Sequence, residues 1–260
     1  MMPPVVIAAA LASGAVIGLV LGLVGGGGSI LAVPLLVYVV GLSSAHAAIG
    51  TAAVAVAANA AASLIGHARA GTVKWPCALV FAAAGVAGAA IGAEAGKAVD
   101  GKRLLMLFGL LMIGVGLSML RKRRAVEAPD VRLSRATAAT LLPRLVPIGL
   151  GVGLAAGFFG IGGGFLIVPG LMMATAMPLK NAVGTSLVVV TALGLTTATS
   201  YALSGYVDWL LVAVMIAGGV AGSGVGIALG RRLAARKGVL ERIFALIVIA
   251  VGIYVAIRGS

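Results

Sequence analysis

The sequence predicts an all-α polytopic membrane protein built from two inverted repeats. Of its 260 residues, 62% are hydrophobic, whereas ordinary soluble domains are about 45–50% apolar. Apolar runs of about 20 residues, the length that spans a bilayer as a helix, recur along the chain. In addition, a Gly-rich motif at Gly25–Pro34 returns at Gly160–Pro169. These observations predict an integral membrane protein with little soluble mass.

The positive charge belongs to the loops. The formal net charge is +13, but Lys and Arg lie between the apolar runs, as topology determinants do in membrane proteins. No basic helix with interleaved aromatic residues is visible, so we expect no nucleic-acid partner. The single Cys77 excludes an internal disulfide and any multi-cysteine metal site. Because nucleotide-binding, zinc and protease motifs are also missing, we expect no cofactor and no enzyme activity.

Each half of the chain contains five apolar segments. They run through 4–24, 29–41, 45–66, 75–96 and 103–120 in the first half, and through 145–159, 164–177, 181–203, 209–230 and 239–258 in the second. A basic loop, 121–144, links the two predicted membrane repeats, 1–120 and 145–260. The second segment of each half is too short to cross a bilayer directly, so we expect a broken, tilted or re-entrant helix.

The repeat is visible residue by residue. At a spacing of 134, Gly50-Thr51 matches Gly184-Thr185, and Trp75 matches Trp209. Glycines spaced by four residues also recur in register, at Gly14, Gly18, Gly22, Gly149, Gly153, Gly157, Gly88, Gly92, Gly96, Gly222, Gly226 and Gly230. Small-residue faces of this kind let membrane helices approach closely. We expect them to pack within one subunit, with a homodimer interface as the alternative, and both indoles to lie at the membrane interface.

Loop charges orient the repeats. The loop 121–144 carries seven basic and two acidic residues, and the loop 231–242 carries five and one, so both are expected in the cytoplasm. The loop 67–74, with Arg69 and Lys74, is then also inside, and its partner 203–208 is outside. Repeat-related loops thus face opposite sides, which predicts inverted repeats of the kind found in secondary transporters.

The Gly-rich breaks are the first candidate binding site. Non-helical backbone at membrane depth is tolerated only where it is buried in protein or lines a polar cavity. A helix that restarts after a break presents free N–H groups and a positive dipole end, which favour anions. The residues concerned are Gly26, Gly27, Gly28 and Ser29 in the first half, and Gly162, Gly163 and Gly164 in the second. The alternative is a tight structural turn.

A second paired motif begins the third segments. It reads His46-Ala-Ala-Ile-Gly-Thr51 in the first half and Lys180-Asn-Ala-Val-Gly-Thr185-Ser186 in the second. Hydroxyl groups can bind anion oxygens, Lys180 brings a charge, and His46 can titrate near neutral pH. Alternatively, the two nitrogen-bearing side chains lie at the interface and the hydroxyls bond to their own helix.

Two more polar residues lie within apolar segments. Asn59 contacts either another helix or the substrate. Glu94 is a carboxylate near a segment end, and it either takes part in proton coupling or pairs with Lys97.

The paired motifs GGGGSILAVP and GIGGGFLIVP, together with KNAVGTSL and its counterpart HAAIGTAA, resemble the sulfite exporter TauE/SafE family of membrane transporters. The resemblance covers nearly the whole chain. It implies a multi-pass permease of the bacterial inner membrane that exports sulfite or an organosulfonate such as sulfoacetate. Ser29 stands where the second repeat has Gly164, and Ala52 where it has Ser186, so we expect the stronger contacts in the second repeat.

The sequence therefore predicts a secondary transporter of a small sulfur-containing anion, with export as the expected direction, working by alternating access in the lipid bilayer. The alternatives are a proton-coupled uptake permease for another small anion and a passive anion channel. The predicted substrate-binding residues are Gly26, Gly27, Gly28, Ser29, Thr51, Gly162, Gly163, Gly164, Lys180, Thr185, Ser186, His46 and Asn59.

Overall fold

The computed structural model describes residues 3–24, 26–120, 131, 133–160, 164–232 and 237–259. Seven of the described helices are long and apolar enough to cross a membrane, which confirms the all-α polytopic fold. The elements are α1 (Pro4–Val24), η1 (Gly26–Leu31), α2 (Ala32–Tyr38), α3 (Ala45–Arg69), α4 (Trp75–Lys97), α5 (Gly101–Leu120), α6 (Arg135–Phe159), α7 (Gly164–Thr175), α8 (Leu179–Leu203), α9 (Trp209–Arg232) and α10 (Lys237–Gly259).

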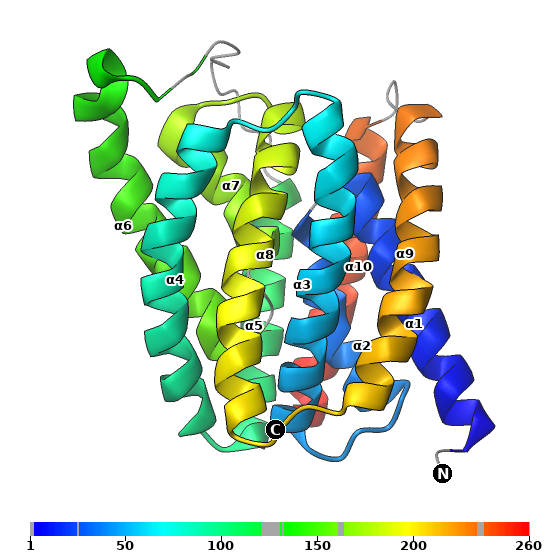
Figure 1. The fold of residues 1–260 in the computed structure, drawn as a ribbon. Coiled ribbons are helices and arrows are strands. Elements are labelled where there is room, and N and C mark those ends of the chain that lie inside the picture. The colour runs from blue at the N-terminus through cyan, green and yellow to red at the C-terminus, as the bar shows by residue number, and fades with distance from the viewer. Residues whose placement is uncertain are drawn as a thin grey trace.

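The long helices lie side by side and the chain passes up and down between two ends (Figure 1). The loop between α3 and α4 lies at the top of this view, which we call the upper end. The loop between α8 and α9 lies at the bottom, the lower end. These two loops are equivalent in the sequence repeat, so equivalent connections lie at opposite ends of the molecule. Trp75 and Trp209 begin the helices that follow these two loops, and both side chains are exposed.

The second apolar segment of each half forms only short helices, as the short apolar runs predicted. In the second half it is α7, whose 12 residues extend about 18 Å at 1.5 Å per residue, well below the roughly 30 Å of a bilayer core. In the first half the segment is divided: Gly26–Gly28, expected as a non-helical break, lies within the 3-10 helix η1, and α2 follows. Short 3-10 pieces commonly serve as connectors.

Helix α6 begins at Arg135, ten residues before the start that hydropathy indicated. Ser134 and Thr137 form a capping box that starts the helix there, since each side chain satisfies a backbone donor of the first turn. Pro143 and Pro147 lie inside the helix, where neighbouring helices and local adjustments make proline tolerable in membrane proteins. The expected loop 121–144 is therefore helical from Arg135 onward, and its residues 121–130 and 132 lie outside the described residues.

The spaced glycines pack helices of one chain together, which confirms the first of the two interpretations above. Gly18 of α1 lies against the backbone of Gly219 of α9, and Gly153 of α6 lies against the backbone of Gly85 of α4. The same register continues along both pairs of helices. Each pair joins one helix from the first half to one from the second, so the two halves are interleaved and do not form separate domains.

Helices α3 and α8 form the centre of the molecule. They pack against each other where Gly194 approaches Ala57, and more of their length is buried than in the other candidate spans. Helix α4 covers α8 and helix α9 covers α3, while α5 and α10 pack together. The third segments, which carry the paired candidate motif, are therefore the most enclosed of the seven candidate spans.

Candidate functional site

Thr51 and Thr185 occupy equivalent positions and make equivalent contacts. Both side chains are fully buried. The Thr51 hydroxyl oxygen accepts a hydrogen bond from the backbone N–H of Asp208 at 3.1 Å. The Thr185 hydroxyl oxygen accepts one from the backbone N–H of Lys74 at 3.0 Å. Because these amides belong to loops at opposite ends of the molecule, the two threonines lie far apart and do not form one site.

His46 lies at the lower end in a cluster of aromatic side chains. Its ring centroid is 5.5 Å from that of Tyr206 and 6.5 Å from that of Tyr201. Its Nε2 atom is buried, as is the hydroxyl of Tyr201, and neither atom has a hydrogen-bond partner among the described residues. Neither tyrosine is among the site residues predicted from the sequence. The repeat spacing of 134 could have drawn attention to them, because it makes Tyr201 equivalent to His67 and Tyr206 equivalent to Thr72 at the opposite end.

Lys180 lies at the upper end, exposed in the first turn of α8. Next to it, the Asn181 side-chain amide donates to the backbone carbonyl of Thr72 at 3.0 Å. The Thr72 hydroxyl in turn lies 3.0 Å from Nδ1 of His67. Ser186 is buried, and its hydroxyl donates to the carbonyl of Val183 in its own helix at 2.8 Å. This end therefore combines an exposed cation with a network that ties the start of α8 to the α3–α4 loop.

The two Gly-rich regions lie next to each other, because η1 packs against α7. Gly28, Ser29 and Gly164 are buried, while Gly26 and Gly27 belong to the first turn of η1. Gly160 ends α6 in the left-handed conformation, with φ 64°, and a side chain there would strike Ile49. Gly162 and Gly163 lie outside the described residues. The described parts of both regions thus lie together, and both pack against α8.

Asn59 is buried where α3 meets α9, beside Gly219. Its side-chain oxygen has no hydrogen-bond partner in the described part of the chain, and the same holds for the hydroxyls of Ser63 and Thr197. Ser63 and Thr197 are themselves equivalent at the spacing of 134. A buried polar atom without a partner costs free energy, so each end of the α3–α8 pair carries a hydroxyl that a polar ligand or water can satisfy.

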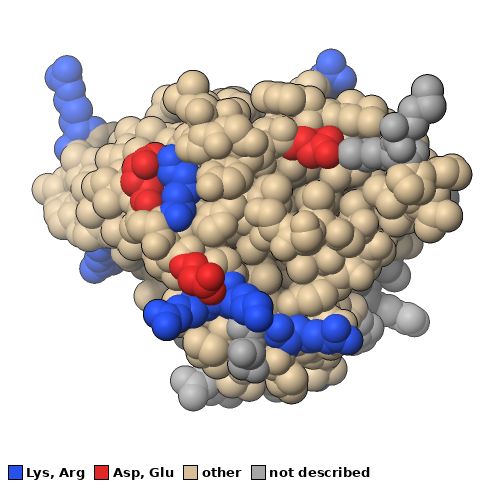
Figure 2. Space-filling model, turned by 90° about the horizontal axis from the view of Figure 1, so that it is seen from below, with Lys and Arg blue, Asp and Glu red and all other residues tan. Residues whose placement is uncertain are grey.

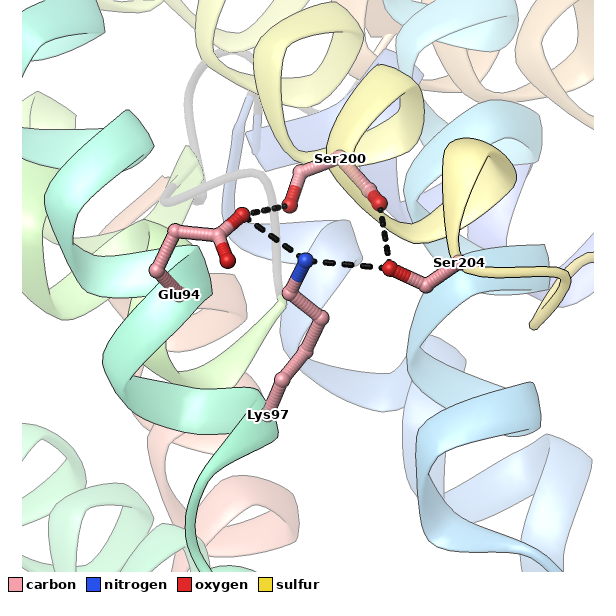
Figure 3. Close-up of polar contacts among 4 residues, drawn as sticks. All are labelled: Glu94, Lys97, Ser200 and Ser204. Atoms are coloured by element: carbon pink, nitrogen blue, oxygen red, sulfur yellow. Dashed lines mark hydrogen bonds and ion pairs between the residues drawn. The ribbon is translucent and has the colours of Figure 1, made fainter.

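Glu94 belongs to an interfacial network at the lower end (Figure 3). Its carboxylate lies 2.7 Å from the Lys97 ammonium and accepts a hydrogen bond from the Ser200 hydroxyl at 2.8 Å. Lys97 also donates to the Ser204 hydroxyl at 3.0 Å. The pairing with Lys97 that the sequence suggested is thus present, and it joins the end of α4 to the end of α8. The Glu94 side chain is 67% exposed within the chain.

No group of three His, Cys, Asp or Glu side chains in the described residues could hold a metal ion. The chemistry available is that of hydrogen-bond donors and cations: amides near the two Gly-rich regions, hydroxyls on α3 and α8, and Lys180.

Comparisons with known proteins agree with this architecture. A probable membrane transporter protein of Xylella fastidiosa (strain 9a5c) is 51% identical over 247 residues, covering 95% of this chain and 94% of that protein. The probable membrane transporter protein YunE of Bacillus subtilis (strain 168) is 27% identical and covers 95% and 96% of the two chains. No solved structure matches significantly. The model of one family, described as sulfite exporter TauE/SafE, matches residues 10–255. The chain is therefore a membrane transporter protein that belongs to the TauE/SafE family.

Proposed function

We propose that the protein is a secondary transporter that exports a small sulfur-containing anion, sulfite or an organosulfonate, across the bacterial inner membrane. Membership of a family described as sulfite exporters is the observation that carries this proposal. The names of the relatives give no substrate and say only that they are probable membrane transporters.

The contact between η1 and α7 supports a central anion site. These two short helices, one from each half, pack against each other. In the proposed site, their first turns direct amide groups and positive dipole ends toward a shared region. A sulfite or sulfonate group offers three oxygens as hydrogen-bond acceptors. In the proposed site, the amides at Gly26–Ser29 and Gly162–Gly164 hold these oxygens, and Asn59 and Ser186 complete the polar lining.

The two threonine contacts support alternating access. Thr51 and Thr185 each hold the loop of the other half closed at one end. In the proposed cycle, inverted repeats open one end at a time, and the corresponding threonine releases its loop amide. The freed hydroxyl then faces the passing anion and serves as a donor. Each threonine thus acts at its own end and at a different stage of the cycle.

The distribution of charge between the two ends suggests the direction of transport that we propose. With the central loop 121–144 in the cytoplasm, the upper end faces inward and Lys180 attracts anions there. His46 then lies on the outer side. The membrane potential favours the exit of an anion by roughly 2.3 kcal/mol per charge per 100 mV. Export can therefore proceed without a coupling carboxylate, and the exposure of Glu94 fits that mechanism better than proton-coupled uptake.

Flux of sulfite and sulfoacetate in proteoliposomes tests the proposal. We expect saturable flux that a membrane potential drives from the upper to the lower side. Lys180→Ala should weaken the apparent affinity on the upper side, while Lys180→Arg should retain it. Flux no greater than in protein-free vesicles would reject the transporter, and flux that never saturates would favour a passive channel.

A further inference from the structure

A cavity opens at the lower end, away from the Gly-rich regions. Its volume is about 250 Å³, and a water molecule in the liquid takes about 30 Å³, so it has room for a small oxyanion and several waters. The residues that line it come from the end of α2, the loop before α3 and the first turns of α3 and α5: Val37, Ser43, Ser44, Ala45, His46, Asp100, Gly101, Lys102 and Leu105.

The polar groups around the cavity favour an anion. Lys102 supplies a cation, and Ser43 and Ser44 supply hydroxyls. His46 lines the cavity with its imidazole beside Gly101, where an added Cβ would lie 3.8 Å from both Nδ1 and Cε1. Its Nε2 atom is buried and has no hydrogen-bond partner among the described residues, so Nδ1 is the ring nitrogen that we assign to a ligand.

Asp100 is the one acidic residue in this lining, and one oxygen of its carboxylate is hydrogen-bonded to backbone amides. Its Oδ1 atom accepts hydrogen bonds from the backbone N–H groups of Lys102 at 3.0 Å and Arg103 at 3.3 Å. The carboxylate therefore caps the start of α5, where the helix dipole offsets a negative charge. On this face most of the surface is uncharged, and a band of basic side chains crosses the lower part of the view beside one acidic group (Figure 2).

We propose that this cavity binds a small oxyanion of the sulfate or sulfite type, held by Lys102, the Nδ1 edge of His46 and the two serine hydroxyls. The inference goes beyond the proposed function, because it requires equilibrium binding at the lower end and no transport. If export also occurs, the cavity lies where an anion leaves the protein.

Calorimetric titration of the purified protein with sulfate tests the proposal. Lys102→Ala should weaken binding about tenfold, as expected for the loss of one charge-assisted contact, and His46→Gln should weaken it less. Asp100→Asn keeps an oxygen for the α5 cap and removes the negative charge, so it should tighten binding. Arg103→Ala is the matched control: it removes the neighbouring cation, which does not line the cavity, and should leave the affinity unchanged.

Three results would overturn the proposal: no sulfate binding to the wild-type protein, equal weakening by Lys102→Ala and Arg103→Ala, or weaker binding after Asp100→Asn. Thermal melting of each variant checks that it is folded. Sulfite flux in proteoliposomes is measured separately, so that absence of transport rejects the exporter while sulfate binding still decides the cavity.

Discussion

The upper and lower ends of the molecule share one kind of hydrogen bond, from a loop backbone amide to a threonine hydroxyl, and differ in the side chains around it. At each end, a buried threonine of a central helix accepts the N–H that precedes a tryptophan-initiated helix of the other half. The pairs are Thr185 with Lys74 at the upper end and Thr51 with Asp208 at the lower end. Thr51 and Thr185, which are the same residue in both halves, thus each tie a central helix to a loop of the other half.

The side chains that face these contacts differ in charge. Lys74 is replaced by Asp208 at the equivalent position, Lys180 by His46, and His67 by Tyr201. The upper end is consequently basic, whereas the lower end has an aromatic cluster and paired charges. This difference indicates that packing is nearly symmetric between the halves, while the electrostatic potential that an anion meets is not.

The largest expected effect concerns sidedness. Cysteines placed at Ser134 and Ser204, in a Cys77→Ala background, should react with an impermeant thiol reagent from opposite sides of the membrane, Ser134 from the cytoplasm and Ser204 from outside. The native Cys77 is buried and should be unreactive, which the parent protein controls. Labelling of both positions from the same side would refute inverted repeats.

The next effect concerns the glycine contacts shared by both halves. Gly18→Ala and Gly153→Ala each drive a methyl group into a neighbouring backbone, and we expect destabilisation by about 1–3 kcal/mol or misfolding. Gly151→Ala in the same helix as Gly153 meets no atom within 4 Å and is the control. Thermal melting in detergent measures the result. If only one of Gly18→Ala and Gly153→Ala lowers the melting temperature, the two pairs of helices do not pack equally.

Loss of a threonine hydroxyl should have an intermediate effect. Thr185→Val and Thr51→Val each leave a loop N–H without its acceptor, which costs about 1–3 kcal/mol when the group is buried. Serine substitutions should restore most of that stability. Anion flux separates the two roles: if the hydroxyls only hold the loops, transport per folded molecule stays normal, which would remove both threonines from the proposed anion path.

The smallest effect is expected at Glu94. Exposed ion pairs contribute little to stability, so Glu94→Gln should leave the melting temperature nearly unchanged. Export should also persist with the same pH dependence. If the substitution abolishes a strong pH dependence of transport, proton-coupled uptake becomes the better explanation of this protein.

The sequence by itself determined the membrane class, the number and order of most segments, and the family. Apolar length, loop charge and glycine spacing carry that information because each depends on local chemistry: a helix must be long enough to cross, and a close helix contact needs small residues. The start of α6 was misplaced for the same reason, since Arg144 and the prolines interrupt the apolar run although a capping box begins the helix earlier.

Only the tertiary structure decided which residues lie close together in space. Thr51 and Thr185 look like one paired site in the sequence, but the chain carries them to opposite ends, where each contacts the other half. The partners of His46 come from the end of α8 and the loop after it, more than 150 residues away in the chain. Spacing along the sequence reveals that two motifs are equivalent. Whether equivalent motifs converge or separate depends on how the helices cross, and that is set by packing between the halves.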